Sequence, residues 1–183
     1  PKTRYFADDN KITIYWADNS ETSVDPISKR RDFEGYRIYK TQAGWDVQGD
    51  QDIAAALKLV ASWDSAGNSV AYDNGFDKIR LAEPVTFEGD ETEYVYKYEI
   101  DKITDGWQHG IALTAFDQGE PGANLESLET SRLANLKRVF TGRAPNNNFA
   151  NGDPFVYPNP YYGSASWEGS SDSEEDRRIM FAN

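Results

Sequence analysis

Residues 93–100 read EYVYKYEI, and this stretch decides the fold class. Tyrosine or isoleucine occupies every second position from Tyr94 to Ile100, and the positions between them hold valine, lysine and glutamate. Successive side chains of a strand point to opposite faces, so a repeat of two predicts a strand with one buried face. The stretch therefore predicts a β-strand that covers an apolar core with its tyrosine-bearing side.

The same alternation recurs in three other stretches, KITIYWAD (11–18), FEGYRIYKT (33–41) and HGIALTAFD (109–117). About seven strands separated by turns, with little helix, predict an all-β fold of the β-sandwich type. The high aromatic content, 14%, suits strands because flat rings pack well on a pleated surface. The side chains expected to build the core are Trp16, Tyr36, Ile38, His109, Ile111 and Leu113.

One segment departs from the strand pattern. Residues 50–56 combine aspartate at an N-cap position with an alanine-rich run, which predicts a short helical insertion. LKLVASW (57–63) follows as a strand. YDNGFDKIRLAEPVTF (72–87) then holds one or two short strands, and Pro84 indicates an edge position. LESLETSRLANLKRVF (125–140) supplies a last strand.

From Thr141 the composition changes to proline, asparagine and glycine with few apolar anchors, which is typical of a linker. Strand-like patterning restarts in VYPNPYYG and RRIMFAN. We therefore expect a sandwich at 8–140, a linker at 141–153 and the incomplete start of a second β-module at 154–183. Because the chain begins at Pro1 without a methionine, we expect an excerpt of a longer polypeptide, whose neighbouring domains are its first partners.

Composition excludes several classes of site and partner. The chain has no cysteine, so disulfides, thiol nucleophiles and cysteine-based zinc sites are ruled out. Its 31 acidic and 19 basic residues leave a formal net charge of −12, which repels nucleic acid and anionic membranes. No apolar run approaches the roughly 20 residues of a membrane span, so no membrane insertion is expected.

The strand pattern brings in a family resemblance. KITIYW, FEGYRIYK and the run from Ile103 through Gly106 and His109 to TAFDQG resemble strands B, C and F of a fibronectin type III domain. That family carries a core tryptophan on strand B and a tyrosine at the entry to strand F. The resemblance implies a fibronectin type III or immunoglobulin-like sandwich. It also places His109 where the family has its corner tyrosine, whose side chain bonds to nearby backbone.

A second resemblance concerns export. FEGYRIYK, RLAEPVTF, LTAFDQGE and NLESLETSRLAN, followed by VYPNPY (156–161), resemble large secreted proteins of the Bacteroidetes. In those proteins VYPNP commonly opens a module similar to the C-terminal sorting domain of type IX secretion. The resemblance implies an exported protein, located outside the cell or on its surface. It implies no catalysis, because fibronectin type III modules mostly act as spacers, adhesion units or companions of catalytic domains.

Catalytic chemistry has few candidates in this chain. The single histidine, His109, is the only residue through which a Ser/His/Asp arrangement could run, and the alternative is a structural role in the corner. No nucleophile elbow, phosphate-binding loop or dinucleotide fingerprint is present. We therefore expect no catalytic residue, no enzyme activity and no organic cofactor.

Calcium and glycans are the ligands that the residue types allow. Asp18, Asn19, Glu21 and Asp25 share one loop and offer the oxygen ligands that calcium prefers, while the alternative is solvated charge. Trp45 and Trp107 lie in or near expected loops, where a ring can stack on a sugar face. The alternative for both tryptophans is that they cap the end of the core.

Together these features predict a non-catalytic structural or adhesive module of a large exported bacterial surface or secreted protein. One alternative is an accessory module of an extracellular polysaccharide-degrading enzyme, which binds glycan or only spaces the catalytic domain. Another is a subunit of an extracellular filament, in which a strand of one copy completes the sheet of an identical copy.

Overall fold

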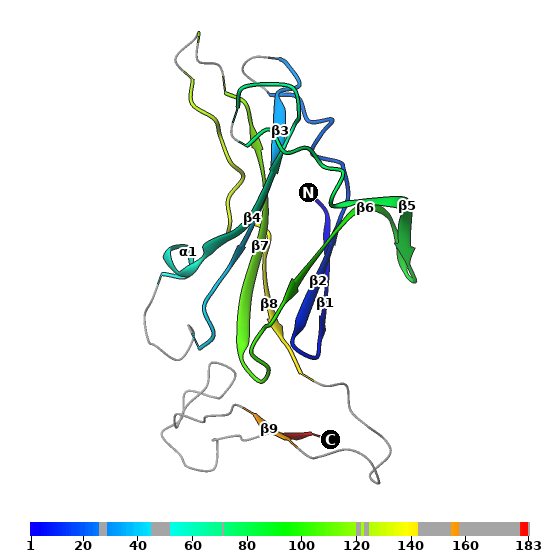
Figure 1. The fold of residues 1–183 in the computed structure, drawn as a ribbon, viewed down its shortest axis with the longest axis vertical. Coiled ribbons are helices and arrows are strands. Elements are labelled where there is room, and N and C mark those ends of the chain that lie inside the picture. Colours follow the sequence, from blue (N-terminus) through cyan, green and yellow to red (C-terminus); the bar gives the residue numbers. More distant parts are fainter. Residues whose placement is uncertain are drawn as a thin grey trace.

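The fold is a sandwich of two antiparallel four-stranded sheets, and the all-β prediction is confirmed (Figure 1). The computed structural model describes residues 1–25, 29–44, 52–70, 72–119, 122, 125–142, 155–157 and 180–182. One sheet has the order β1-β2-β6-β5 and the other has the order β4-β3-β7-β8. The strands are β1 (Thr3–Asp8), β2 (Lys11–Trp16), β3 (Phe33–Lys40), β4 (Lys58–Asp64), β5 (Arg80–Phe87), β6 (Asp90–Asp101), β7 (Gln108–Asp117) and β8 (Leu136–Phe140).

The order of these strands is that of an immunoglobulin-like Greek key. Lettered along the chain as A, B, C, C′, D, E, F and G, the strands β1 to β8 form the sheets A-B-E-D and C′-C-F-G. Immunoglobulin constant domains pair A-B-E-D with C-F-G, so β4 is an additional edge strand here. The strand with Pro84, β5, lies at the edge of its sheet, where a missing backbone N–H costs no ladder bond.

Aromatic rings from both sheets fill the centre of the core. Trp16 of β2, Tyr36 of β3 and Tyr96 of β6 are all fully buried. The ring centroid of Trp16 lies 5.5 Å from that of Tyr96 and 5.7 Å from that of Tyr36. Burying one such ring removes about 150–250 Å² from water, which contributes roughly 4–6 kcal/mol to folding. Around this trio lie further fully buried aliphatic residues, Ile12, Ile14, Ile38, Ile111 and Leu113.

The predicted helical insertion is present and short. The helix α1 (Ile53–Ala56) begins after Asp52, whose carboxylate accepts a hydrogen bond from the backbone N–H of Ala54 at 2.9 Å. Residue 50, where the helix was expected to begin, lies outside the described residues. Strand β4 follows α1 directly, as predicted.

The last strand is shorter than predicted, because most of the residues expected in it form an irregular segment before β8. Strand β8 begins only at Leu136. Residues 125–135, here called the strap, run antiparallel beside the end of β7, on the same edge that β8 pairs with, and the Glu129 side chain reaches over the outer sheet face (Figure 1). Backbone bonds hold the strap to the end of β7, including Asp117 N–H to Leu128 O at 3.0 Å and Thr130 N–H to Ala115 O at 2.9 Å. The strap therefore lengthens the sheet edge beside β7.

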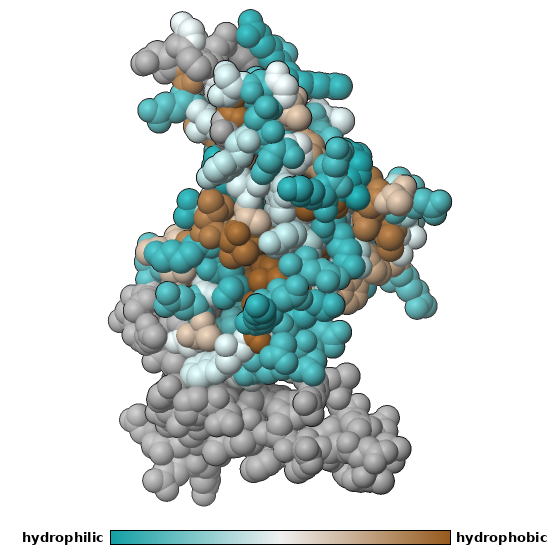
Figure 2. All heavy atoms as spheres, in the orientation of Figure 1, coloured by the Kyte–Doolittle hydropathy of each residue, from teal (hydrophilic) through white to brown (hydrophobic). Residues whose placement is uncertain are grey.

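The outer face of the other sheet is covered in part by the β5–β6 hairpin. The ring of Phe87 lies 5.0 Å from that of Phe6 on β1 and 5.2 Å from that of Tyr15 on β2, measured between centroids. The guanidinium of Arg4 lies 3.5 Å from the carboxylate of Asp90, at the start of β6. The hairpin tip is thereby folded onto β1 and β2, and Figure 2 shows apolar residues gathered on its side of the molecule.

The C-terminal part contains one described pair of strands. Strand β9 (Phe155–Tyr157) pairs antiparallel with β10 (Met180–Ala182), so that Met180 lies opposite Tyr157. Most of the expected linker, residues 143–153, and most of the expected second module lie outside the described residues. No helix within the described part of the chain is long and apolar enough to cross a membrane.

Candidate functional site

The lone histidine ties a loop to a core strand. His109 is the second residue of β7, is 1% exposed, and places its Nε2 atom 2.9 Å from the backbone oxygen of Thr104. A carbonyl oxygen can only accept, so Nε2 carries the hydrogen and donates it. The hydroxyl of Thr141 donates to the same oxygen at 3.3 Å. His109 therefore makes the kind of bond to nearby backbone that the corner tyrosine makes in the resemblance above.

The four residues expected to bind calcium contact different parts of the protein, and their calcium role stays a prediction. The Glu21 carboxylate accepts bonds from the hydroxyls of two core tyrosines, Tyr36 at 3.3 Å and Tyr96 at 2.5 Å. Burial, with the charge of Glu21 beside them, raises the pKa of both tyrosines, so both hydroxyls stay protonated as donors. Glu21 thus fastens the β2–β3 loop to the core.

The other expected calcium ligands serve the loop in different places. The side-chain oxygen of Asn19 accepts the backbone N–H of Lys2 at 2.9 Å, and the backbone N–H of Asp25 donates to Arg30 O at 2.9 Å. The charge of Asp18 lies near the two tyrosines that Glu21 binds, and it also raises the pKa of Tyr36 and Tyr96. Among the residues that the structure describes, no group of three or more histidine or acidic side chains is placed to hold a metal ion.

The tryptophans expected at the surface differ from one another. Trp107 is half-buried and its ring lies over Gly44, where an added Cβ would come within 2.7 Å of the ring. Gly44 also has a φ of +70°, so glycine suits this turn for both reasons. Trp45 lies outside the described residues. Trp63, at the end of the predicted strand LKLVASW, is 7% exposed in β4 and packs against Tyr98.

Two buried carboxylates were missed by sequence reasoning. Asp64 is fully buried at the end of β4, where its Oδ1 accepts the backbone N–H of Asn74 at 2.8 Å while the amide oxygen of Asn74 accepts the N–H of Asp64 at 3.0 Å. Glu34, also fully buried, accepts bonds from the side-chain amide of Asn68 at 3.0 and 3.1 Å. Both carboxylates organise the β4–β5 loop, and the short-spaced Asp and Asn residues of that loop were their only sequence signal.

A third missed carboxylate, Glu129, anchors the strap. Its Oε2 accepts from Arg37 at 2.7 Å and from the Tyr39 hydroxyl at 3.0 Å, and its Oε1 accepts from Thr114 at 2.6 Å. Burial acts to raise the pKa of Glu129, but the three donors outweigh it and lower that pKa below its usual range. The carboxylate is therefore held ionised against the outer face of β3 and β7.

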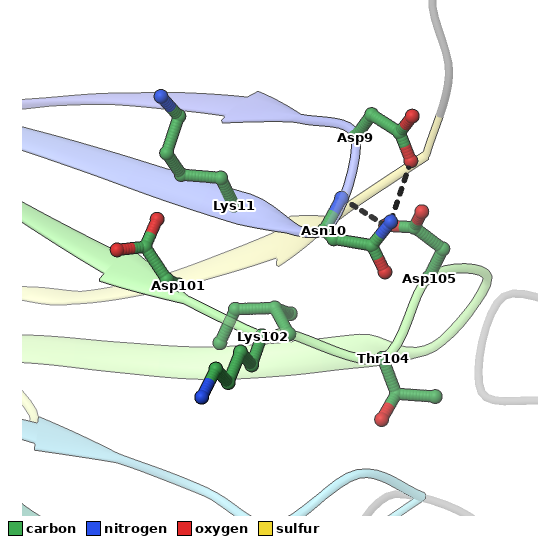
Figure 3. Close-up of a pocket in the computed structure, with 8 residues that line it drawn as sticks. Asp9, Asn10, Lys11, Asp101, Lys102, Thr104 and Asp105 are labelled. Atoms are coloured by element: carbon green, nitrogen blue, oxygen red, sulfur yellow. Dashed lines mark hydrogen bonds between the residues drawn. The ribbon is translucent and has the colours of Figure 1, made fainter.

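A shallow hollow of about 660 Å³ lies between the β1–β2 turn and the β6–β7 loop (Figure 3). Asn10 links its two sides, because its backbone N–H donates to Asp105 at 2.9 Å and its side-chain amide donates to Asp9 at 2.7 Å. Burial, and then the neighbouring Asp9, raise the pKa of Asp105. Lys11 and Lys102 line the same hollow, so its charge is mixed.

A narrower cleft of about 320 Å³ lies where the β2–β3 loop, the end of β7 and the strap meet. This cleft, the strap cleft, has an apolar wall formed by Val24, Phe33, Phe116 and Leu128. Its ionisable lining residues are all carboxylates, Asp25, Asp32, Asp117 and Glu129. The cleft therefore combines apolar walls with charge of a single sign.

Comparison with known proteins adds no relative to this geometry. No protein-family model, curated protein or solved structure matches the chain.

Proposed function

We propose that this chain is a non-catalytic structural or adhesive module of a large exported bacterial surface or secreted protein. One observation carries the proposal: the groups best suited to chemistry are engaged in holding the fold together. His109 is bonded to the backbone of Thr104, and Glu21 is bonded to two core tyrosines. Residues that act as acids, bases or nucleophiles need access to a substrate, and these two groups face the protein's own interior.

The same assignment fits the large polar network at the loops. Glu34, Asp64 and Glu129 each fasten one long connection to a strand end or a sheet face. Connections held in this way keep a sandwich rigid at its ends, which is where modules in a chain meet their neighbours or partners. The export that the VYPNPY resemblance implies supports a location outside the cell for such a module.

A turnover test on the full chain separates this role from catalysis. The chain is incubated with panels of glycosides, esters and peptides, beside the variants His109→Tyr and Asp77→Asn. His109→Tyr keeps a donor in the corner, and Asp77 is an exposed aspartate that serves as the control. We expect no turnover above that of a heat-unfolded sample. Turnover that survives in Asp77→Asn and is lost in a folded His109→Tyr variant would contradict the proposal.

A second role, as a glycan-binding accessory module, is favoured by one surface. Phe6, Tyr15 and Phe87 cluster on the outer face of the first sheet, and Phe6 is 39% exposed. Arg4 lies over the ring of Phe87 at 4.8 Å and adds a donor for sugar hydroxyls. Binding to soluble polysaccharides that is lost in Phe6→Ala, while the Tm stays within about 2 °C of wild type, would support this role. Absence of binding to every polysaccharide tested would remove it.

A further inference from the structure

The strap cleft has the size and shape of a small binding site. Its volume of about 320 Å³ is at the lower end of the range of ligand pockets, roughly 300–1,000 Å³. Its three sides come from parts of the chain far apart in sequence, the β2–β3 loop, the end of β7 and the strap. The cleft exists only because the strap pairs with the end of β7, close to the β2–β3 loop.

Apolar side chains of the cleft are exposed to water at its rim. Val24 on the β2–β3 loop is 49% exposed, and Leu128 on the strap is 67% exposed. Phe33 and Phe116 line the same cleft. An extended alkyl stem lying between these groups would remove apolar surface from water on both of its sides.

The polar side of the cleft offers a carboxylate that is already oriented. The Oδ1 atom of Asp117 accepts the backbone N–H groups of Gly119 at 2.9 Å and Leu128 at 2.7 Å. None of the described residues donates a hydrogen bond to its other oxygen, Oδ2. A carboxylate fixed through one oxygen can bind a charged donor through the other without losing side-chain freedom, which strengthens a charge-assisted hydrogen bond.

The protein itself shows how these groups hold a guanidinium. Arg37 places its guanidinium carbon 3.9 Å from the ring centroid of Phe116 and donates to Glu129 at 2.7 Å. Both Phe116 and Glu129 also line the strap cleft. An aromatic face beside a carboxylate is thus already used on the outer sheet face to bind a basic side chain.

We propose that the strap cleft binds a lysine or arginine side chain presented by a partner polypeptide. The stem lies against the apolar wall, and the cationic head bonds to Asp117 with Asp25 and Asp32 nearby. The formal net charge of −12 attracts a basic partner over a longer range and speeds its encounter. This inference rests on the proposed adhesive role and names the chemistry of the partner.

The test is a titration of the ¹⁵N-labelled full chain with N-acetyl-arginine amide, followed through its backbone amide resonances. N-acetyl-norleucine amide, which has an apolar stem without the charge, is the matched probe. We expect saturable shifts at residues 115–117 and 128–130 with the arginine probe, and about tenfold weaker binding of norleucine. Equal affinity for the two probes would overturn the proposal, because the cleft would then recognise only apolar surface.

Three variants complete the test. Asp117→Asn keeps the acceptor for Gly119 and Leu128 but removes the charge, and we expect it to weaken arginine binding about tenfold. Leu128→Ser removes exposed apolar wall and should weaken binding about threefold. The control Asp77→Asn, an exposed carboxylate outside the cleft, should change binding by less than about twofold.

Unchanged binding in Asp117→Asn, whose spectrum also reports whether it is folded, would overturn the site. The outcome is independent of the turnover test. A cleft that binds neither probe removes this inference and leaves the non-catalytic role standing. Turnover that depends on His109 contradicts that role whether or not arginine binds.

Discussion

Two carboxylates each hold a segment against the outside of one sheet, and they do so in different ways. Glu129 draws its donors from β3 and β7, and its nearest donor in sequence is Thr114, 15 residues away. Asp90 draws most of its donors from its own hairpin, the hydroxyl of Tyr94 and the backbone N–H of Thr92. Its one distant donor is Arg4, at 3.5 Å.

The difference shows why two hydrogen-bonded carboxylates need not contribute equally to the stability of the fold. Removing Glu129 takes an acceptor away from three donors in the body of the sandwich, so its loss is felt by the whole fold. Donors of Asp90 instead belong mainly to a projecting hairpin, which can rearrange without disturbing the core. The range of the contacts decides whether a carboxylate supports the domain or only its own turn.

Glu129→Ala provides the strongest test of this comparison. We expect it to lower the free energy of unfolding by about 2–4 kcal/mol, because Arg37, Tyr39 and Thr114 lose a shared, partly buried acceptor. Urea unfolding measures the change. The matched control is Glu126→Ala, an exposed glutamate of the same strap, which should stay within about 0.5 kcal/mol of wild type. Equal effects of the two substitutions would show that the hydrogen bonds of Glu129 do not stabilise the fold.

His109 tests the effect of burial separately from that of contact range. Its partner Thr104 is close to it in sequence, but the His109 side chain is buried. His109→Ala should lower the free energy of unfolding by about 2–3 kcal/mol, through a cavity and a lost donor. His109→Tyr should preserve or raise the Tm, because its hydroxyl can also donate to the backbone of the β6–β7 loop. Thermal unfolding of both variants decides the matter. A stable alanine variant would mean that the corner bond does not support the fold.

The pH dependence of the free energy of unfolding tests whether Glu129 is ionised in its network. Hydrogen-bond donors lower the pKa of Glu129 in the folded state. Its contribution to the free energy of unfolding is therefore complete above the pKa of the unfolded chain, about 4.3, and is lost as the pH falls through the pKa of the folded state. The stability difference between wild type and Glu129→Gln should therefore be largest near pH 7 and shrink below about pH 4. Urea midpoints measured across that range give the result. A difference that is constant with pH would exclude the ionised network.

Asp90→Asn should have the smallest global effect of the four. Hydrogen bonds from Tyr94, and then from Thr92, lower the pKa of Asp90, but these donors lie on the hairpin itself. We expect an unchanged Tm and faster hydrogen exchange at the Thr92 amide, which donates to the Asp90 carboxylate at 2.9 Å. A fall in Tm comparable to that of Glu129→Ala would break the comparison between the two anchors.

Strand patterns predicted the parts of the fold that depend on local sequence. The repeat of two in KITIYW, FEGYRIYK and EYVYKYEI corresponds to β2, β3 and most of β6, with the expected faces buried. The strap was wrongly included in the last strand. One signal was available: the outer positions of β7, such as Ala112 and Phe116, are also apolar, which indicates a strand covered on both faces.

The sequence by itself determined which segments become strands and which residues face the core, because side-chain alternation is a local property. Only the tertiary structure decided what the polar groups do. Glu21 meets Tyr96 across 75 residues and Glu129 meets Arg37 across 92, and no spacing in the sequence encodes such distances. The strap cleft arises in the same way, since its apolar wall and its carboxylates come from segments that meet only when the chain has folded.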